Sequence, residues 1–411
     1  MAPIRRGARL QYRRWSSLPS ELLESIAQKL PCSFDYISFR SVCSAWRSAT
    51  PQIKFTPVMM FPFDLTTGTI KFFSPSDDRA FLLKQDYLRD KVLCGTTEGI
   101  LTLMDKRACM SLFNPFTGEQ ISLPQCNAQL ALTSSGRRVK MINGEHWVCV
   151  SKNRSVVTLG MPIQLCSMRH FFIKEVILSP SVNFGGERYA MATLCNSKKV
   201  AYCRVGDKRW KLVDTSLSLS VGSVAYCNGR FYAMDVGGNM AFCDVGNPLS
   251  FTRHPLPVIT GRYNAFKLFD SRGKLMMVVL KTYHEDPVEE ELERYTYEVY
   301  RLEDQTTWVR VTNIGKDILF VSRYYNSHSQ SRGGVSGYYK SHSMYLEGRL
   351  QEWKGNCICF PEPTMFMPNP AVADRVQMEC VDLADGRKRF IETGETKNFI
   401  DTVTWFKPRL M

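Results

Sequence analysis

The chain contains 411 residues, of which 44% are hydrophobic, 12% aromatic and 22% charged, and its formal net charge is +14. These values describe a globular protein that is long enough for a sizeable core and for two domains. The longest purely apolar run, Leu275–Leu280, is far shorter than the roughly 20 residues of a membrane helix. We therefore expect no membrane partner.

The first residues form a basic segment with five arginines. No apolar segment of the signal-peptide type follows it, so we expect the protein in the cytoplasm, the nucleus or both. We interpret residues 1–14 as a disordered, solvated arm, with phosphate binding or nuclear import as the alternative. The acidic run from His284 to Arg294 is likewise expected to be an exposed loop. The arginines of the arm are Arg5, Arg6, Arg9, Arg13 and Arg14.

The 14 cysteines do not have the spacing of a typical zinc site, because none of them forms a CxxC pair. Most lie in apolar, strand-like runs such as HWVCV and MAFC, and we predict that they are reduced core thiols. The alternative is metal binding by Cys357 and Cys359, whose CxC spacing in a strand places both side chains on one face. We expect no metal and no other cofactor.

Residues 15–51 have the pattern of a short helical module. Pro19 and Glu21 suit the first turn of a helix that we expect to end near residue 30. Asp35 can cap a second helical segment, which Thr50-Pro51 stops. The apolar positions of the first helix occupy more than one narrow stripe: Leu22, Leu23, Ile26, Ala27 and Leu30. Those of the second recur at helical spacing: Phe39, Val42, Cys43 and Trp46.

A module of this size lies below the roughly 40 residues at which a chain usually needs help to fold alone. Burial of a Leu, Ile or Val side chain contributes about 1.5 to 3 kcal/mol. Exposed apolar side chains would therefore favour docking onto a second protein. The alternative is a helical hairpin that packs on the following domain, and the residue pattern alone leaves both interpretations open.

The segments LPSELLESIAQKL and FRSVCSAWRS resemble an F-box, the short helical module that binds the Skp adaptor of cullin-based ubiquitin ligases. The resemblance covers about 35 residues and combines a Leu-Pro start, a Leu-Leu-x-x-Ile helix and a Val-Cys-x-x-Trp-Arg end. Some of the matching side chains would pack in the module's own core, and the sequence does not divide them from the adaptor-facing ones. The resemblance implies a three-helix F-box at 15–51 with an adaptor-facing surface of Leu18, Pro19, Leu22, Ile26, Leu30, Val42, Cys43, Trp46 and Arg47.

From residue 52 onwards one kind of segment recurs, a glycine at a turn followed by a β-rich apolar run. Many copies are followed by a second apolar strand that enters a polar turn, and three of these second strands lead into another β-rich segment. Two strands plus a hairpin about every 43 residues is the period of a propeller blade. The copies begin at Gly99, Gly144, Gly186, Gly229, Gly273, Gly315 and Gly355, with differences of 45, 42, 43, 44, 42 and 40 residues. The second strands begin at Leu112, Tyr202, Phe242, Val299 and Cys380.

Residues 52–411 resemble the KIB-type, kelch-like β-propeller domain that follows the F-box in a large plant family. The segments CGTTEGILTLMD, LFNPFTGEQISLP and DSRGKLMMVV carry this resemblance, which implies a mainly β fold. Seven glycine strands favour about seven blades, with six or eight as alternatives. PVMMFPF and TIKFFSP precede the first copy and suggest either an eighth blade or a split blade that closes the ring. A β-sandwich is the alternative architecture.

The late units contain insertions. A strand is followed by its hairpin after 13 residues at Gly99 and Gly229, but after 26 at Gly273 and 25 at Gly355. The sixth unit has the segment SRYYNSHSQSRGGVSGYYKSHS in place of a hairpin copy. Loops on a rigid scaffold often contain binding residues, and Tyr and Arg are strong interface anchors. We therefore name as candidate target-binding residues Tyr324, Tyr325, Arg332, Tyr338 and Tyr339, with disorder of this segment as the alternative.

The sequence contains no HExxH, GxxxxGK[ST], GxSxG or GxGxxG motif, and we name no catalytic, cofactor-binding or metal-binding residue. The F-box and propeller resemblances imply a non-catalytic substrate-recognition subunit of an SCF-type (Skp, cullin, F-box) ubiquitin ligase. It would bind the Skp adaptor, and through it a cullin, and would present an unidentified target protein. The alternative is a basic nucleic-acid-binding or transcription-linked propeller protein, although nucleic acid is not the partner that we expect.

Overall fold

The computed structural model divides the chain into two compact units, Met1–Phe55 and Thr56–Arg409. None of the described helices is long and apolar enough to cross a membrane. The arm that we expect at 1–14 lies outside the described residues. These are 15–30, 33–50, 58–74, 79–135, 138–153, 156–181, 186–247, 250–253, 265–283, 294–304, 307–324, 338–345, 355–361, 375–395 and 404–406.

The described residues of the first unit form a 3-10 turn and three helices, in agreement with the expected three-helix module. The first helix begins after Pro19 and ends close to the predicted position. The prediction for the second helical segment is wrong in two respects. Asp35 lies inside the first turn instead of capping it, and the helix breaks at Cys43, whose extended backbone (φ −164°, ψ 172°) starts a separate third helix. The elements are η1 (Trp15–Ser17), α1 (Ser20–Gln28), α2 (Ser33–Ser41) and α3 (Ser44–Ser48).

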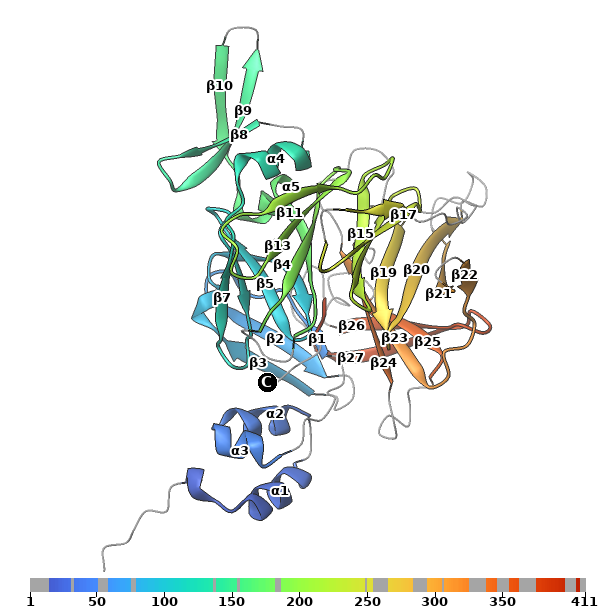
Figure 1. The fold of residues 1–411 in the computed structure, drawn as a ribbon. Helices are drawn as coiled ribbons and strands as arrows, with labels where there is room; N and C mark the ends of the chain where they lie inside the picture. The colour runs from blue at the N-terminus through green and yellow to red at the C-terminus, as the bar shows by residue number, and fades with distance from the viewer. Residues whose placement is uncertain are drawn as a thin grey trace, which may run out of the picture. The chain divides into compact units, whose positions relative to one another are not determined.

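The described residues of the second unit form seven sheets, in agreement with the expected mainly β fold and consistent with the expectation of about seven blades, with six or eight as alternatives (Figure 1). Three of them begin the unit in sequence. The closing sheet has the order β28-β1-β2-β3, the next has the order β4-β5-β6-β7, and the insertion sheet has the order β10-β9-β8. Their strands are β1 (Val58–Met60), β2 (Thr69–Ser74), β3 (Arg79–Lys84), β4 (Lys91–Thr97), β5 (Ile100–Asp105), β6 (Met110–Phe113), β7 (Gln120–Leu123), β8 (Arg138–Ile142), β9 (His146–Asn153), β10 (Val156–Pro162) and β28 (Thr404–Phe406).

Three four-stranded sheets follow in simple order, and the last sheet has five strands in the order β24-β23-β25-β26-β27. The four-stranded sheets contain β11 (Ile173–Leu178), β12 (Tyr189–Leu194), β13 (Lys199–Arg204) and β14 (Lys211–Asp214); β15 (Val221–Cys227), β16 (Arg230–Asp235), β17 (Met240–Asp244) and β18 (Thr252–Arg253); and β19 (Ala265–Ser271), β20 (Lys274–Tyr283), β21 (Arg294–Glu303) and β22 (Thr307–Arg310). The five-stranded sheet contains β23 (Asp317–Tyr324), β24 (Tyr338–Tyr345), β25 (Cys357–Pro361), β26 (Arg375–Asp382) and β27 (Lys388–Glu395). Short helical segments are η2 (Asp86–Leu88), α4 (Ala128–Ser135), η3 (Leu165–Ser167) and α5 (Met168–Phe171).

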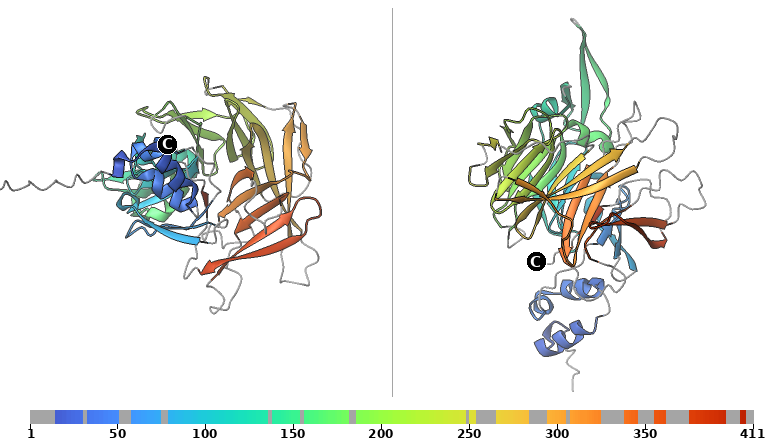
Figure 2. Two further views of the ribbon diagram at one scale, coloured as in Figure 1. Left: turned by 90° about the horizontal axis from the view of Figure 1, so that it is seen from below. Right: turned by 90° about the vertical axis from the view of Figure 1, so that its right-hand side faces the viewer.

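Six of the seven sheets form a ring, and buried apolar clusters lie between neighbouring sheets. One cluster joins the β4–β7 and β11–β14 sheets. Others join β11–β14 to β15–β18, β15–β18 to β19–β22, β19–β22 to the five-stranded sheet, and the five-stranded sheet to the closing sheet. The rings of Phe72 and Phe406 contact Phe116 and so join the closing sheet to the β4–β7 sheet. The architecture is therefore a propeller and not a sandwich, as Figure 2 shows from below.

The insertion sheet lies outside this ring, because β4 and β11 of the two flanking sheets contact each other directly. The Gly144 copy of the repeat belongs to this sheet. The Gly315 and Gly355 copies both belong to the five-stranded sheet, in which β23 and β25 pair in parallel. The seven glycine copies therefore do not correspond to seven blades of the ring. The Gly144 copy lies outside the ring, and the Gly315 and Gly355 copies share one blade.

The recurring glycine has a direct stereochemical cause at four copies. Gly99, Gly144, Gly229 and Gly273 have φ between 71° and 79°, and the residue before each of them also has a positive φ. Two consecutive residues in this region define the type I′ turn, which matches the twist of an antiparallel hairpin and favours glycine at the second position. The repeat thus marks hairpins, in blades and in the insertion sheet alike.

The ring is closed by strands from both ends of the second unit. β28 pairs with β1 in an antiparallel register that places Trp405 opposite Met59. The predicted PVMMFPF and TIKFFSP strands, which correspond to β1 and β2, thus belong to a split blade and not to an eighth one. Phe406 is fully buried, and its ring lies 5.5 Å from Phe72 and 5.9 Å from Phe116.

We expect Phe406→Ala to lower the free energy of unfolding of the propeller by about 3 to 5 kcal/mol, because it leaves a cavity where the chain ends meet. Phe390→Ala is the matched control, since the side chain of Phe390 is 54% exposed and its removal should have little effect. Chemical denaturation followed by tryptophan fluorescence measures both. Equal destabilisation by the two variants would contradict the closing role of Phe406.

Candidate adaptor and target interfaces

The helix α1 has two apolar faces. Leu23 and Ala27 lie one turn apart and are 1% and 6% exposed, so they form part of the module's own core. Leu22 and Ile26 have the same spacing on a neighbouring face, but they are 52% and 40% exposed. Side chains four residues apart lie on the same side of a helix. The outer pair is therefore available to a second protein, and the inner pair is not.

Two further exposed apolar side chains lie in the same unit. Val42 is 56% exposed at the break between α2 and α3, and Trp15 is 74% exposed in η1. The indole nitrogen of Trp46 donates a hydrogen bond to the carbonyl oxygen of Trp15 (3.0 Å), and the Trp46 ring lies 4.4 Å from that of Phe39. Trp46 therefore holds η1 against α2 and α3. Trp15 is not among the predicted adaptor-facing residues, although its position just before the Leu-Pro start of the motif could have indicated that it belongs to the same surface.

The nine predicted adaptor-facing residues divide into two groups, which the sequence did not separate. Pro19, Leu22, Ile26 and Val42 are exposed, whereas Leu18, Leu30, Cys43, Trp46 and Arg47 are partly buried. Arg47 donates a hydrogen bond to the carbonyl oxygen of Arg40 (3.4 Å). Arg40 is itself buried and donates to the carbonyl and hydroxyl oxygens of Thr50. The role of all nine residues in adaptor binding stays a prediction.

The predicted target-binding segment belongs to the β23–β24 hairpin. Tyr324 is the last residue of β23 and pairs with Tyr338, the first residue of β24; the next pair is Arg323 with Tyr339. β23 and β24 thus form a hairpin in the sixth unit, where the sequence contains no recognisable copy of the second strand. Tyr325 and Arg332 lie outside the described residues. The structure therefore brings Tyr324, Tyr338 and Tyr339 together at one end of a hairpin.

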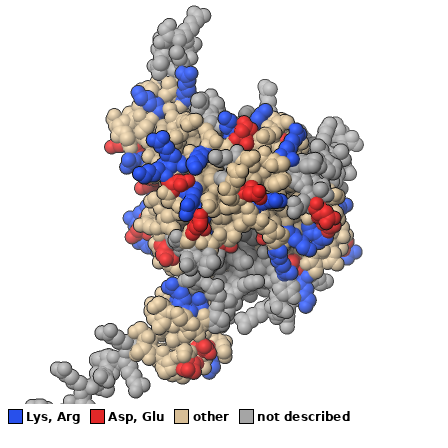
Figure 3. All heavy atoms as spheres, in the orientation of Figure 1, with Lys and Arg blue, Asp and Glu red and all other residues tan. Residues whose placement is uncertain are grey.

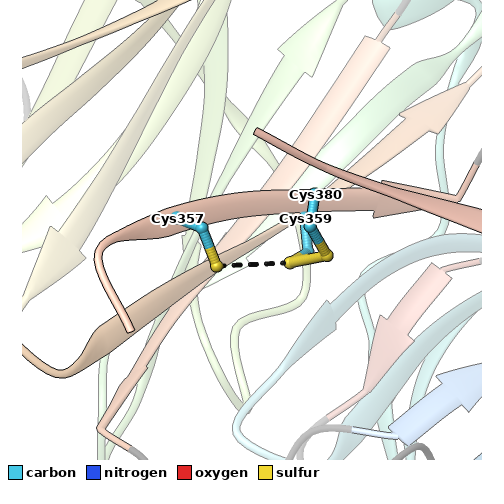
Figure 4. The surroundings of a disulfide bond; sticks show 3 residues. All are labelled: Cys357, Cys359 and Cys380. Atoms are coloured by element: carbon cyan, nitrogen blue, oxygen red, sulfur yellow. Dashed lines mark hydrogen bonds between the residues drawn. A yellow bond between two sulfur atoms is a disulfide. The ribbon is translucent and has the colours of Figure 1, made fainter. Parts of the chain in front are cut away.

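The prediction of reduced core thiols is wrong for Cys359 and Cys380, which form a disulfide. They face each other on β25 and β26 with a Cα–Cα distance of 4.2 Å, a separation that sequence spacing does not reveal. The sulfur of Cys357 lies 3.7 Å from that of Cys359 (Figure 4). Among the described residues, no group of three His, Cys, Asp or Glu side chains is placed to hold a metal ion.

The other described cysteines are not part of a disulfide. Burial raises the pKa of Cys243 to about 12 and that of Cys357 to about 11. Burial likewise raises the pKa of Cys203 and of Cys227. Because the thiolate is the reactive form, these thiols remain protonated and inert near neutral pH. Their surroundings fit packing and not nucleophilic chemistry.

A buried ion pair joins two sheets that are not neighbours in the ring. The ammonium group of Lys267 on β19 lies 2.7 Å and 2.9 Å from the two carboxylate oxygens of Glu175 on β11. The side chains of Lys267 and Glu175 are only 6% and 12% exposed. The first strands of successive sheets contact one another, so this pair lies among the inner strands of the propeller.

A helical module with an outward apolar face, followed by a closed propeller, defines an F-box protein with a C-terminal β-propeller domain. The family model described as "KIB1-4 beta-propeller" matches residues 72–382, and the model of the F-box domain matches residues 15–56. The chain belongs to the KIB1-4 β-propeller family. The resemblance inferred from the sequence is thus confirmed.

Two relatives from Arabidopsis thaliana are similar over most of their length, and a third is similar over a short segment. F-box protein SKIP23 is 26% identical over 332 residues, which cover 75% of this chain and 77% of the relative. F-box/kelch-repeat protein At1g64840 is 24% identical over 324 residues, with 76% and 78% covered. F-box protein At2g16300 is 57% identical, but only over 37 residues, or 9% of this chain and 12% of the relative.

We expect Glu175→Gln to destabilise the propeller by about 3 to 5 kcal/mol at neutral pH, because it leaves the buried ammonium group of Lys267 without its counter-charge. Asp244→Asn is the control. It breaks the ion pair of Asp244 with Arg230, whose side chains are 63% and 31% exposed, and should cost about 0 to 1 kcal/mol. Urea denaturation measures the difference, and equal effects would contradict a structural role for the inner pair.

Proposed function

We propose that this chain is the substrate-recognition subunit of an SCF-type ubiquitin ligase. The F-box unit would bind a Skp-type adaptor, and through it a cullin, while the propeller binds a target protein. The observation that carries the proposal is the outward pair Leu22 and Ile26 on α1, which the module's own core leaves exposed. The family membership and the F-box names of the relatives support it.

The mechanism that we propose requires no chemistry from this chain. Binding of the adaptor and of the target to the same polypeptide raises the effective concentration of the target near the catalytic subunits of the ligase. A rigid propeller suits this role because six sheets hold the connecting segments in fixed positions around the ring. Ubiquitin transfer itself would be performed by other subunits.

The adaptor interface is tested by the two faces of α1. We expect Leu22→Ala combined with Ile26→Ala to weaken capture of the purified Skp adaptor by about 30-fold or more, because two buried contacts are lost at the interface. The melting temperature of the full chain should change little, since both side chains are exposed in the free protein. Binding is measured by biolayer interferometry with immobilised adaptor.

The matched control is Leu23→Ala on the inner face of the same helix. It should destabilise the F-box unit because Leu23 is 1% exposed, and adaptor binding should fall only as far as the unit unfolds. Replacement of Leu18 and Pro19 by Ala is a second interface variant. Undiminished adaptor binding by both interface variants would mean that the helical unit is a packed module without this partner.

We expect target choice to depend on the segment that joins β23 to β24. Replacing residues 325–337 with a short Gly-Ser linker retains the Tyr324–Tyr338 pair and should preserve the fold and adaptor capture. The same replacement of residues 284–293, which join β20 to β21, is the control. Affinity purification with mass spectrometry compares the captured proteins, and an unchanged set after the first replacement would show that the prediction is wrong.

A further inference from the structure

The insertion sheet β8–β10 is firmly anchored, although the ring closes without it. Trp147 on β9 is buried, its indole nitrogen donates to the carbonyl oxygen of Arg107 in the β5–β6 turn (3.0 Å), and its ring lies 4.9 Å from that of Phe172. Val139 and Ile163 join the same apolar cluster as the two flanking sheets. The base of the sheet is therefore rigidly fixed, while β9 and β10 project from the propeller (Figure 1).

The two faces of this sheet differ. Val139 pairs with Cys149 and Met141 with Trp147, and these residues form the face that packs on the propeller. The alternate residues of β8, Arg138 and Lys140, are exposed and lie on the opposite face. Because directly paired residues share a face, the outer face contains the row Arg138, Val150 and Leu159 across the three strands.

The outermost strand, β10, has unusual apolar exposure. Leu159 is 56% and Met161 85% exposed, and Met161 lies where the register of β10 shifts against β9. Of the described strands, only β9 pairs with β10. In an antiparallel ladder every second residue of an edge strand directs its N–H and C=O groups away from its neighbour. Such an edge accepts an added strand, and natural proteins usually protect it.

The segment that contains the sheet is strongly basic. Residues 137–162 include five Lys and Arg but a single acidic residue, Glu145. Figure 3 shows basic side chains on this sheet and on the adjoining surface of the propeller. Exposed apolar side chains on an open strand edge, those of Leu159 and Met161, fit a polypeptide, whereas phosphate-backbone binding relies on cations and aromatic stacking. Complementary charge would both steer such a partner and exclude basic ones.

We infer that the insertion sheet binds an acidic segment of the target protein as an added strand along β10, with the segment's apolar side chains on Leu159 and Met161 and its carboxylates near Arg138 and Lys140. This inference rests on the proposed function, and it specifies that the target protein contains an acidic segment. β7 leads to the insertion sheet at the end of the propeller opposite the type I′ turns of Gly99, Gly229 and Gly273. The β23–β24 hairpin reaches the same end, since β23 starts beside Arg272 of such a turn.

The test uses the full chain and a phage-displayed library of random twelve-residue peptides. Selected peptides are expected to combine Asp or Glu with Val, Ile or Leu, and synthetic copies should bind more weakly as salt concentration rises. Leu159→Ser combined with Met161→Ser should reduce their affinity about tenfold or more. Arg138→Glu combined with Lys140→Glu should reduce it by a similar factor and should reverse the salt dependence.

Two matched controls lie on edge strands elsewhere. Leu82→Ser on β3 removes an apolar side chain that is 70% exposed, and Lys211→Glu on β14 reverses an exposed charge. Both controls should leave peptide affinity unchanged. Circular dichroism and melting temperature should be native-like for all four variants, because each changed side chain is exposed in the wild-type protein.

Selection of peptides without acidic residues, or affinity that is unchanged in both insertion-sheet variants, would overturn the inference. So would a library that yields no binder while a 20-base-pair DNA duplex binds with the same dependence on Arg138 and Lys140. Adaptor capture is measured in parallel for every variant. If the wild-type chain captures the adaptor but the peptide result is negative, this inference alone is overturned. If the wild-type chain does not capture the adaptor, the proposed ligase function is overturned.

Discussion

The pairing of β28 with β1 is the interaction on which the rest of the propeller depends. Each sheet of the ring buries apolar side chains against a neighbour on both sides, so an open ring would expose two faces that are otherwise buried. At the junction, Phe406 is fully buried among Phe72 and Phe116. A strand of only three residues thus joins chain segments more than 300 residues apart and completes the cyclic packing.

The F-box unit differs from the sheets of the ring because it leaves one of its apolar faces exposed. Its single core takes only one apolar face of α1, that of Leu23 and Ala27, and the neighbouring face remains in contact with solvent. A unit of about 40 residues has too little interior to bury both faces. The small size that limits the module's own stability therefore also leaves it with an exposed apolar surface.

Two elements of the propeller differ from the regular four-stranded blade, the insertion sheet and the β23–β24 hairpin. The insertion sheet and the β23–β24 hairpin interrupt the simple order of strands. The ring closes without the insertion sheet, whereas β23 contributes to the apolar clusters on both sides of its own sheet. Both elements reach the end of the ring opposite the type I′ turns of Gly99, Gly229 and Gly273. Tight turns leave little exposed backbone for a partner, whereas a projecting hairpin offers side chains and a strand edge together, so one end of the ring is suited to recognition.

The sequence alone determined the features that arise from local chemistry. Helical spacing and the Leu-Pro start predicted α1, and the positive φ required at Gly99, Gly229 and Gly273 produced the visible repeat. The family motifs at 15–56 and 72–382 followed from the same residues. Even the split blade was foreseeable, because two extra strands preceded the first glycine copy.

The tertiary structure decided what depends on contacts between distant residues. Gly144 and Gly99 both open a hairpin, yet only packing shows that the first lies outside the ring. Leu22 and Leu23 are adjacent and chemically identical, and only the neighbouring helices make one exposed and the other buried. Cys359 meets Cys380, and Glu175 meets Lys267, because the strands that hold them are brought together by the sheets. Local patterns specify turns and periods, whereas burial and pairing are properties of the assembled ring.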